Sequence, residues 1–350
     1  MGKASVNVRR EAIALVIACA LLCAAACSPP PTRVSPKVQG VTATASFGGY
    51  RVVHGWPRVP EGEILGWVVS GVGVDSRGDV FVLHRAGRDW PASDLLDLRP
   101  ILRPTVLVFD SGTGELRSAW GASIFAMPHG LTLDYNNNVW ITDVALQQVF
   151  KFSHEGRLLL TIGERGVAGK DAAHFDRPTK VAVAPNGAFY VSDGYRNSRV
   201  VKFAPDGRFV LEWGSKGSGP GQFDLPHGIA LDARGRVYVA DRTNARVQIF
   251  DGDGRYISEW KGEAFGRPFD IAVAPDGTAF VADGGDMPAN PPDRSGVVVV
   301  REGIVTERFG RFGVYDGELY RAHDLAASKD GVVYVGDANG RVQKFVPGNR

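Results

Sequence analysis

The sequence has 350 residues, of which 44 are glycine and 21 are proline, a composition suited to a fold with many tight turns. Its formal net charge is +2, and removing residues 1–26 brings it to zero, so the chain lacks the basic character of nucleic-acid-binding proteins. All three cysteines lie within residues 19–27, which excludes an internal disulfide from the chain that follows them.

Residues 1–26 predict a signal peptide, because Lys3, Arg9 and Arg10 precede an apolar run that ends at Ala26. The small residues directly before Cys27 are similar to a bacterial lipobox, so we expect Cys27 to be lipidated. Cleavage after Ala26 without lipidation is the alternative. This predicts an exported protein, lipid-anchored to the cell envelope, that faces the periplasm or the cell exterior and touches the membrane only through its anchor. The Pro-rich residues 27–47 predict an extended tether.

Residues 48–350 contain a repeated pattern of short strands and turns. An apolar strand that ends in aspartate occurs five times, at intervals of 50, 48, 42 and 54 residues, as "VWITD", "FYVSD", "VYVAD", "AFVAD" and "VYVGD". A sixth copy, "VFVLHR", comes first and is followed by the insert "AGRDWPASDLLDLRPILRP". Because the aspartate recurs in five units, we expect it to hold turns rather than to take part in catalysis.

Each unit reads as four short alternating strands, and six such units predict an all-β, six-bladed β-propeller in a single domain. The last unit lacks its fourth strand at the C-terminus. The N-terminal stretch "GGYRVVHGWP", residues 48–57, is expected to supply that strand and to close the ring, which removes the exposed sheet edges. We expect a monomer.

One position in the first strand of each unit, called the channel position below, carries histidine in alternate units. It is His129 in "MPHGLTLD", His227 in "LPHGIALD" and His323 in "RAHDLAAS". The other three units carry Ser70, Thr179 and Phe269 there. Because the first strands of a propeller line its channel, three inward imidazoles predict the His₃ arrangement of a catalytic zinc site, with a Pro-His-Gly turn fixing the direction of the ring. Ordinary buried channel residues are the alternative.

The repeats resemble the NHL family of propeller repeats. The segments "LHRAGRDW", "MPHGLTLDYNNNVWITDVALQQVFK" and "HFDRPTKVAVAPNGAFYVSDGYRNSRVVKF" resemble the peptidyl-α-hydroxyglycine α-amidating lyase family, and the resemblance spans residues 50–347. It implies zinc held by the three histidines. It also implies Tyr195 of "SDGY" as general base and Arg85 and Arg242 as catalytic residues. A structural calcium ion is implied at the Asp324 carboxylate and the backbone carbonyls of Val72 and Leu131.

The family reaction splits the C–N bond of a peptidyl-α-hydroxyglycine-type carbinolamide into an amide and glyoxylate, so the implied substrate is a peptide or small molecule with that terminus. Arg85 is expected beside Tyr195, where a cation favours the phenolate. Arg85 or Arg242 would grip the substrate carboxylate. The oxidative half of the bifunctional family members is missing, so another protein must supply the hydroxylated substrate.

The sequence departs from the family at two disulfides of the animal enzymes. One cysteine pair falls on Asp176 and Arg196, for which we expect an ion pair, and the other falls on Tyr238 and Ile249, for which we expect an apolar contact. Two other functions stay open at this stage. One is a non-catalytic extracytoplasmic scaffold that binds protein or cell-wall ligands, and the other is a different propeller hydrolase such as a lactonase.

Overall fold

The computed structural model describes residues 46–47, 49–63, 65–263, 265–285 and 294–348. The chain divides into two units, Met1–Ala43 and Thr44–Arg350, and every described residue belongs to the second. The predicted signal peptide, Cys27 and residues 27–45 of the predicted tether therefore lie outside the described residues. Within the described part, no helix has the length and apolar character that a membrane crossing requires.

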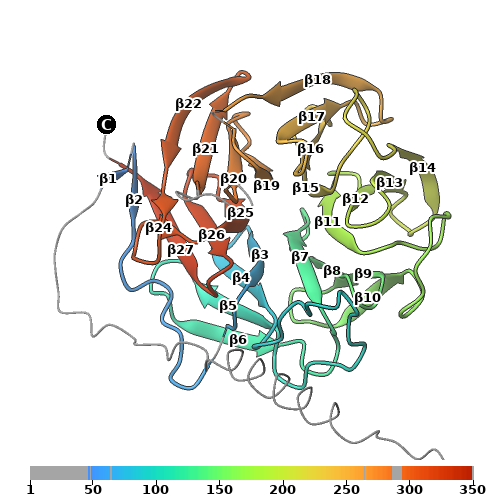
Figure 1. Cartoon of the computed structure of the whole chain (residues 1–350). Helices are drawn as coiled ribbons and strands as arrows, with labels where there is room; N and C mark the ends of the chain where they lie inside the picture. The colour runs from blue at the N-terminus through green and yellow to red at the C-terminus, as the bar shows by residue number, and fades with distance from the viewer. Residues whose placement is uncertain (1–45, 48, 64, 264, 286–293, 349–350) are drawn as a thin grey trace, which may run out of the picture. The chain divides into compact units, whose positions relative to one another are not determined.

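Six β-sheets stand around a central channel, as the six-bladed prediction requires (Figure 1). Blade 1 contains β3 (Val69–Val74), β4 (Asp79–His84), β5 (Val106–Asp110) and β6 (Leu116–Trp120). Blade 2 contains β7 (Pro128–Leu133), β8 (Val139–Asp143), β9 (Gln148–Phe152) and β10 (Leu158–Ile162). Blade 3 contains β11 (Pro178–Val183), β12 (Phe189–Asp193), β13 (Arg199–Phe203) and β14 (Phe209–Trp213).

The remaining two four-stranded blades follow the same plan. Blade 4 contains β15 (Pro226–Leu231), β16 (Val237–Asp241), β17 (Arg246–Phe250) and β18 (Tyr256–Lys261). Blade 5 contains β19 (Pro268–Val273), β20 (Ala279–Asp283), β21 (Gly296–Arg301) and β22 (Ile304–Phe309). A short parallel pair, β23 (Arg311–Phe312) and β24 (Glu318–Leu319), leads into the last blade.

Blade 6 closes the ring with strands from both ends of the propeller. Its sheet contains β25 (Ala322–Ala327), β26 (Val333–Asp337), β27 (Val342–Pro347), β2 (Tyr50–Val52) and β1 (Ser46–Phe47). Tyr50 pairs with Pro347 across β2 and β27, so the predicted N-terminal closure is confirmed. The propeller begins at Ser46, two residues inside the segment expected to be tether.

Apolar faces of adjacent blades form the core. The second strand of each blade is buried on both sides, as the packing of a sheet between two neighbours requires. In one such layer Phe81 of blade 1 packs with Ile141 and Phe152 of blade 2. The recurrent aspartates do hold turns. Asp143 is fully buried and accepts the backbone N–H groups of Ala126, Met127, Ala145 and Leu146.

The strand register shifts at the channel position in all six blades. On β7, for example, Pro128 pairs with Asp143 and the next paired residue is Leu131, so His129 and Gly130 have no direct partner on β8. The expected Pro-His-Gly turn is therefore wrong, because the motif opens a strand. Glycine is needed at position 130 for space rather than for a turn, since a Cβ there would lie 2.3 Å from the carbonyl oxygen of Thr179. A bulge of this kind re-aims the side chain that it carries.

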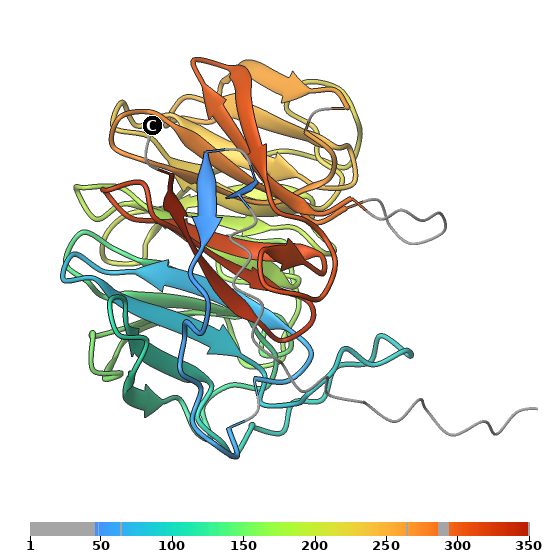
Figure 2. The same ribbon diagram turned by 90° about the vertical axis from the view of Figure 1, so that its left-hand side faces the viewer.

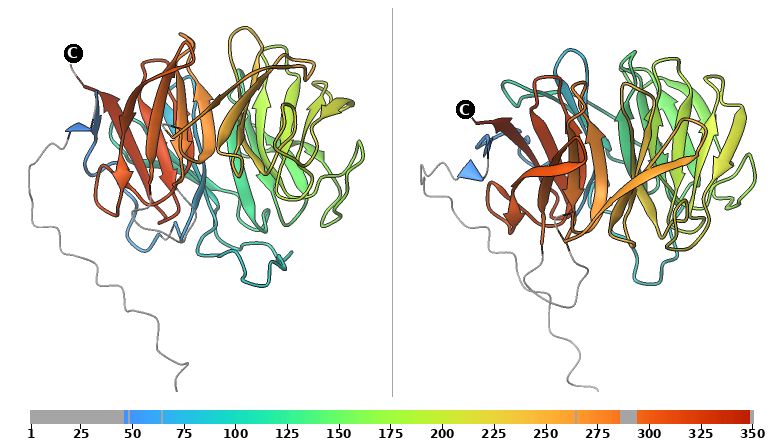
Figure 3. Two further views of the ribbon diagram at one scale, coloured as in Figure 1. Left: turned by 45° about the horizontal axis from the view of Figure 1, so that its top comes forward. Right: turned by 90° about the horizontal axis from the view of Figure 1, so that it is seen from above.

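The connections between second and third strands lie on the same face of the propeller as the channel positions. First and second strands are antiparallel, and Pro226 at the start of β15 pairs with Asp241 at the end of β16. Residues just after a second strand therefore meet the histidines of the first strands. The insert between β4 and β5, residues 85–105, is the connection that extends from this face in blade 1 (Figures 2 and 3).

Candidate metal centre and active site

The three predicted histidines meet at the centre of the channel. The ring centroids of His129 and His227 are 4.7 Å apart. The ring centroid of His323 lies 5.1 Å from that of His129 and 5.0 Å from that of His227. One nitrogen from each ring lies within 4.8 Å of the other two, close enough for a shared metal ion. All three side chains are buried. Alternate blades therefore do bring their channel positions together.

Hydrogen bonds fix the orientation of two of these rings. Nδ1 of His129 lies 2.9 Å from the carbonyl oxygen of Thr179, and Nδ1 of His227 lies 2.7 Å from that of Phe269. Because a carbonyl oxygen only accepts, both Nδ1 atoms carry the hydrogen and both Nε2 atoms are unprotonated, each with a lone pair that can accept or bind a metal. The two carbonyls belong to the channel positions of the next blades. This carbonyl contact is the outer support that metal-binding histidines commonly have.

The electrostatic surroundings keep the histidines neutral. Burial, together with the charge of Arg85, lowers the pKa of His129 to about 3. Burial also lowers the pKa of His227 and His323 well below the usual value for histidine. Nδ1 of His323 is buried without a hydrogen-bond partner. Three neutral imidazoles with inward lone pairs suit a borderline-soft divalent cation such as Zn²⁺, so the residues fit the metal that the resemblance implies.

Tyr195 reaches this centre from the connection between β12 and β13. Its hydroxyl lies 2.9 Å from Nε2 of His129 and 3.4 Å from Nε2 of His227. Its ring packs against Trp90 of the insert, with centroids 5.0 Å apart. The structure therefore places the predicted base directly at the histidine cluster.

Arg85 and Arg242 flank Tyr195. Burial lowers the pKa of each guanidinium, and in both the nearby Tyr195 opposes that shift. Arg85 donates from Nε to the carbonyl oxygen of Pro128 at 3.1 Å, which fixes it beside the first strand of blade 2. Arg242 lies over the ring of Phe269, 3.8 Å from its centroid. Both predicted arginines therefore belong to the site.

Trp90 and Asp94 of the insert, which the repeat pattern did not predict, also contribute to the site. Asp94 accepts hydrogen bonds from Nε1 of Trp90 at 2.9 Å and from Arg177 at 2.6 Å, and it also pairs with Arg196. These contacts hold the insert against the Tyr195 connection. The insert occurs once, so comparison of the repeats gave no signal for Trp90 or Asp94.

The two replaced disulfide positions have different outcomes. Arg196 pairs with Asp94 rather than with Asp176, so the expected Asp176–Arg196 ion pair is wrong, because the insert brings a carboxylate closer. Tyr238 and Ile249 are cross-strand partners on β16 and β17 and pack in one apolar cluster, as expected.

The carboxylate predicted to bind calcium contacts an ammonium group instead. Asp324 accepts the backbone N–H of Val72 on one oxygen at 2.8 Å, and its other oxygen lies 2.8 Å from Nζ of Lys180. Lys180 also bonds to Asp270 at 2.5 Å. Although burial alone would lower it, the pKa of Lys180 is raised by these two carboxylates. Leu131 takes part in the channel wall next to Gly71. These residues do not fit the calcium ion that the resemblance implies.

Comparisons with known proteins cover the repeats and most of the chain. The NHL repeat family model matches residues 175–203 and 223–250. Peptidyl-alpha-hydroxyglycine alpha-amidating lyase 2 of Drosophila melanogaster is 35% identical over 316 residues, which cover 84% of this chain and 75% of that protein. The chain belongs to the peptidyl-α-hydroxyglycine α-amidating lyase family.

A second relative places the family domain within a larger protein. The peptidylglycine alpha-amidating monooxygenase of Rattus norvegicus is 39% identical over 307 residues, and the aligned region covers 81% of this chain but 30% of the rat protein. This chain therefore spans less than one third of the length of the rat protein. Among solved structures, the gluconolactonase XC5397 of Xanthomonas campestris has a TM-score of 0.58 at 14% identity, covering 91% of this chain and 96% of its own. That likeness concerns the propeller fold alone.

Proposed function

We propose that this protein is a zinc-dependent lyase that cleaves peptidyl-α-hydroxyglycine-type carbinolamides to an amide and glyoxylate. The observation that carries the proposal is the contact between the Tyr195 hydroxyl and Nε2 of His129, 2.9 Å apart inside the three-histidine centre. It puts the Tyr195 oxygen beside the atoms that would bind the metal, where its phenolate form would accept a proton. His129, His227 and His323 would hold that metal.

Bound zinc would act as a Lewis acid that makes the substrate hydroxyl easier to deprotonate. Tyr195 lies within hydrogen-bond reach of His129 and His227, and in the proposed reaction its phenolate form takes the proton from the substrate hydroxyl. The O–H electron pair becomes the second bond of the aldehyde carbonyl, and the C–N bond breaks with its electrons going to nitrogen. Tyr195 then returns the proton to that nitrogen. The products are one amide and one glyoxylate, with atoms and charge balanced.

The arginines account for recognition of an acidic substrate terminus. Arg85 and Arg242 flank Tyr195, and the charges of Arg267 and Arg321 also act on Arg242. A buried, positively charged surround of this kind binds a carboxylate, and the planar guanidinium can do so through two parallel hydrogen bonds. We infer that Arg242 holds the carboxylate of the hydroxyglycine unit, while Arg85 supports the charge of Tyr195.

The cellular setting is a separate proposal, for which the N-terminal residues are the support. We propose that the protein is exported, lipidated at Cys27 and monomeric, and that its hydroxylated substrate is made by a separate oxidative enzyme. The class of that enzyme is fixed by the chemistry, since it must hydroxylate the α-carbon of a C-terminal glycine.

The test is one preparation with two measurements. Residues 28–350 are purified, bound metal is measured by elemental analysis, and glyoxylate is followed during incubation with α-hydroxyhippurate. We expect about one zinc per chain and glyoxylate release that stops when the metal is chelated and returns when zinc is added. Absence of both zinc and glyoxylate would overturn the proposal. Zinc without glyoxylate would favour a non-catalytic scaffold.

A further inference from the structure

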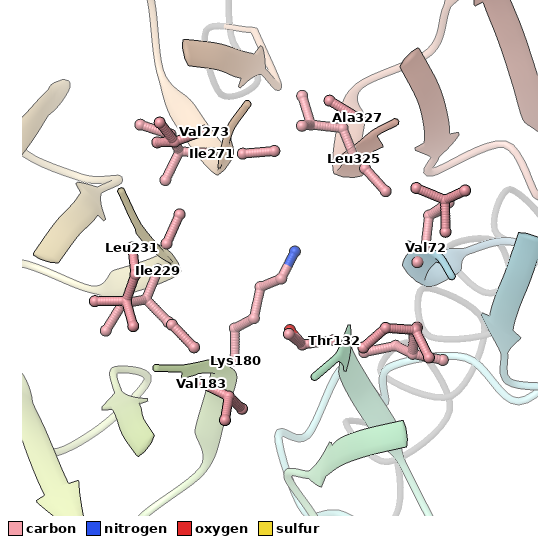
Figure 4. Close-up of a pocket in the computed structure, with 18 of the residues that line it drawn as sticks. Val72, Thr132, Lys180, Val183, Ile229, Leu231, Ile271, Val273, Leu325 and Ala327 are labelled. Atoms are coloured by element: carbon pink, nitrogen blue, oxygen red, sulfur yellow. The ribbon is translucent and has the colours of Figure 1, made fainter. Parts of the chain in front are cut away.

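A second set of charged side chains lies in the channel, one residue further along the first strands than the channel position. That next position is glycine in three blades, lysine in blade 3 and aspartate in blades 5 and 6, namely Gly71, Gly130, Lys180, Gly228, Asp270 and Asp324. The register shifts described above make these neighbours of the channel positions also face inward. Lys180 extends toward the middle of the ring, among apolar side chains such as Ile229 and Leu325 (Figure 4).

This lysine joins three blades through buried contacts. Its Nζ lies 2.5 Å from Asp270 on β19 and 2.8 Å from Asp324 on β25. The side chains are 9%, 1% and 4% exposed for Lys180, Asp270 and Asp324. The backbone N–H groups of Val72 and Leu325 donate to the same two carboxylates. A buried carboxylate pair requires a cation, and the chain supplies one itself.

The arrangement puts an ammonium group where a calcium ion would need the carboxylates. Calcium takes six to eight oxygen ligands, and the only carboxylates at these six positions, Asp270 and Asp324, already bond to Lys180. The Lys180 ammonium occupies the point between the two carboxylates where a cation would bind, and its charge repels one. A side chain at Gly228 would also collide with Asp270, since a Cβ there would lie 2.4 Å from Oδ1.

We propose that the Lys180 ammonium replaces the structural calcium of the family as a covalently attached cation. It ties blade 3 to blades 5 and 6 and fixes Asp324, which directly follows the histidine of blade 6. A bound ion stabilises a fold by an amount that rises with the logarithm of its free concentration, whereas an attached charge does not depend on any supply. The stability of this propeller is therefore independent of calcium.

The first experiment uses the unchanged protein. It is stripped with a chelator and reloaded with zinc alone or with zinc and calcium, and the melting temperature and bound calcium are measured. We expect equal melting temperatures and no retained calcium. Stoichiometric calcium together with a higher melting temperature would overturn the proposal. Lyase activity is not the readout, so this result is separate from the test of the proposed reaction.

The second experiment exchanges the cation. Lys180→Met keeps the length of the side chain and removes its charge, and we expect the melting temperature without calcium to fall by roughly 5–10 °C. Calcium should recover part of this loss in Lys180→Met but have no effect on the control Lys216→Met, whose side chain is 70% exposed. An Lys180→Met protein as stable as its parent without calcium would contradict the proposal. If Lys180→Met does not fold, the first experiment still tests the proposal, because it uses the unchanged protein.

Discussion

The hydroxyl of Tyr195 and Nε2 of His129 are 2.9 Å apart, although the two residues are on different blades. Nδ1 of His129 donates to Thr179, so Nε2 is the acceptor and the tyrosine is the donor in this contact. The same nitrogen atom is the expected metal ligand. The base and the metal centre of the proposed reaction therefore share one point in the channel.

Removing the tyrosine hydroxyl should abolish most of the activity without loss of metal. In Tyr195→Phe the ring still packs against Trp90, so the fold and the histidines are undisturbed. We expect kcat for glyoxylate release to fall by about 10²–10⁴-fold, the usual contribution of a positioned base. Zinc content should equal that of the parent. Tyr315→Phe, at an exposed position, is the matched control. Unchanged kcat in Tyr195→Phe would remove this residue from its proposed role.

Removing one of the histidines should remove the metal. His227→Ala takes away a ring whose Nε2 is directed inward, and two remaining imidazoles do not make a three-ligand zinc site. We expect bound zinc well below that of the parent and glyoxylate release near background, measured on the same sample. His174→Ala is the control. His174 lies outside the three-histidine centre, and its Nδ1 bonds to Asp171 at 2.9 Å. A zinc-replete His227→Ala protein would contradict the assignment.

Arg242 should act on substrate carboxylate rather than on the fold. Its guanidinium lies over Phe269 at the site, with the charge directed toward Tyr195. We expect Arg242→Met to lower kcat/KM for α-hydroxyhippurate by about 10–100-fold, mainly through KM, as loss of a charge-assisted bond predicts. For a substrate whose carboxylate is blocked as an amide, kcat/KM should differ little between Arg242→Met and the parent. An equal loss on both substrates would show that Arg242 does not bind the carboxylate.

The insert should depend on Asp94 for its position. Asp94→Asn weakens the contacts to Arg177 and Arg196 and loosens Trp90 against Tyr195. We expect a higher KM and faster tryptic cleavage after Arg88 and Arg99 in the insert, with an unchanged melting temperature. Asp97→Asn is the control for cleavage after Arg88, since the hydrogen bonds of Asp97 among the described residues are with Arg99 within the insert. Equal cleavage rates for the two variants would argue against a positioning role.

His84 should make the stability of blade 1 depend on pH. It replaces the recurrent aspartate, is fully buried, and has a pKa lowered to about 4 by burial, with Glu63 and Arg103 as the charged neighbours. The unfolded chain takes up this proton near the ordinary pKa of 6.5. Stability from the neutral ring is therefore complete above that value and is lost as the pH falls toward the folded-state pKa.

His84→Asn removes this titration. We expect the difference in free energy of unfolding between parent and variant to shrink by about 2 kcal/mol between about pH 7 and pH 5, as 1.5 pKa units predict. Urea unfolding at several pH values measures it. A difference that stays constant with pH would show that His84 is not held neutral by the fold.

The sequence by itself determined the parts of the structure that repeat. Strand number, blade number and the N-terminal closing strand follow from the recurring pattern, because each unit obeys the same local rules of alternation and turn chemistry. The three-histidine centre also follows from the pattern. His129, His227 and His323 occupy one position in alternate units, and the symmetry of a ring carries equal positions to one axis.

Only the tertiary structure decided the contacts that occur once. Asp94 pairs with Arg196 because the insert folds across a neighbouring blade, and nothing in the spacing of these residues predicts that distance. Lys180 lies between Asp270 and Asp324 because the strand register shifts and re-aims the residue after the channel position. A lysine among glycines and aspartates at that position was visible in the sequence. Its partners are 90 and 144 residues away, and only the closed ring brings them together.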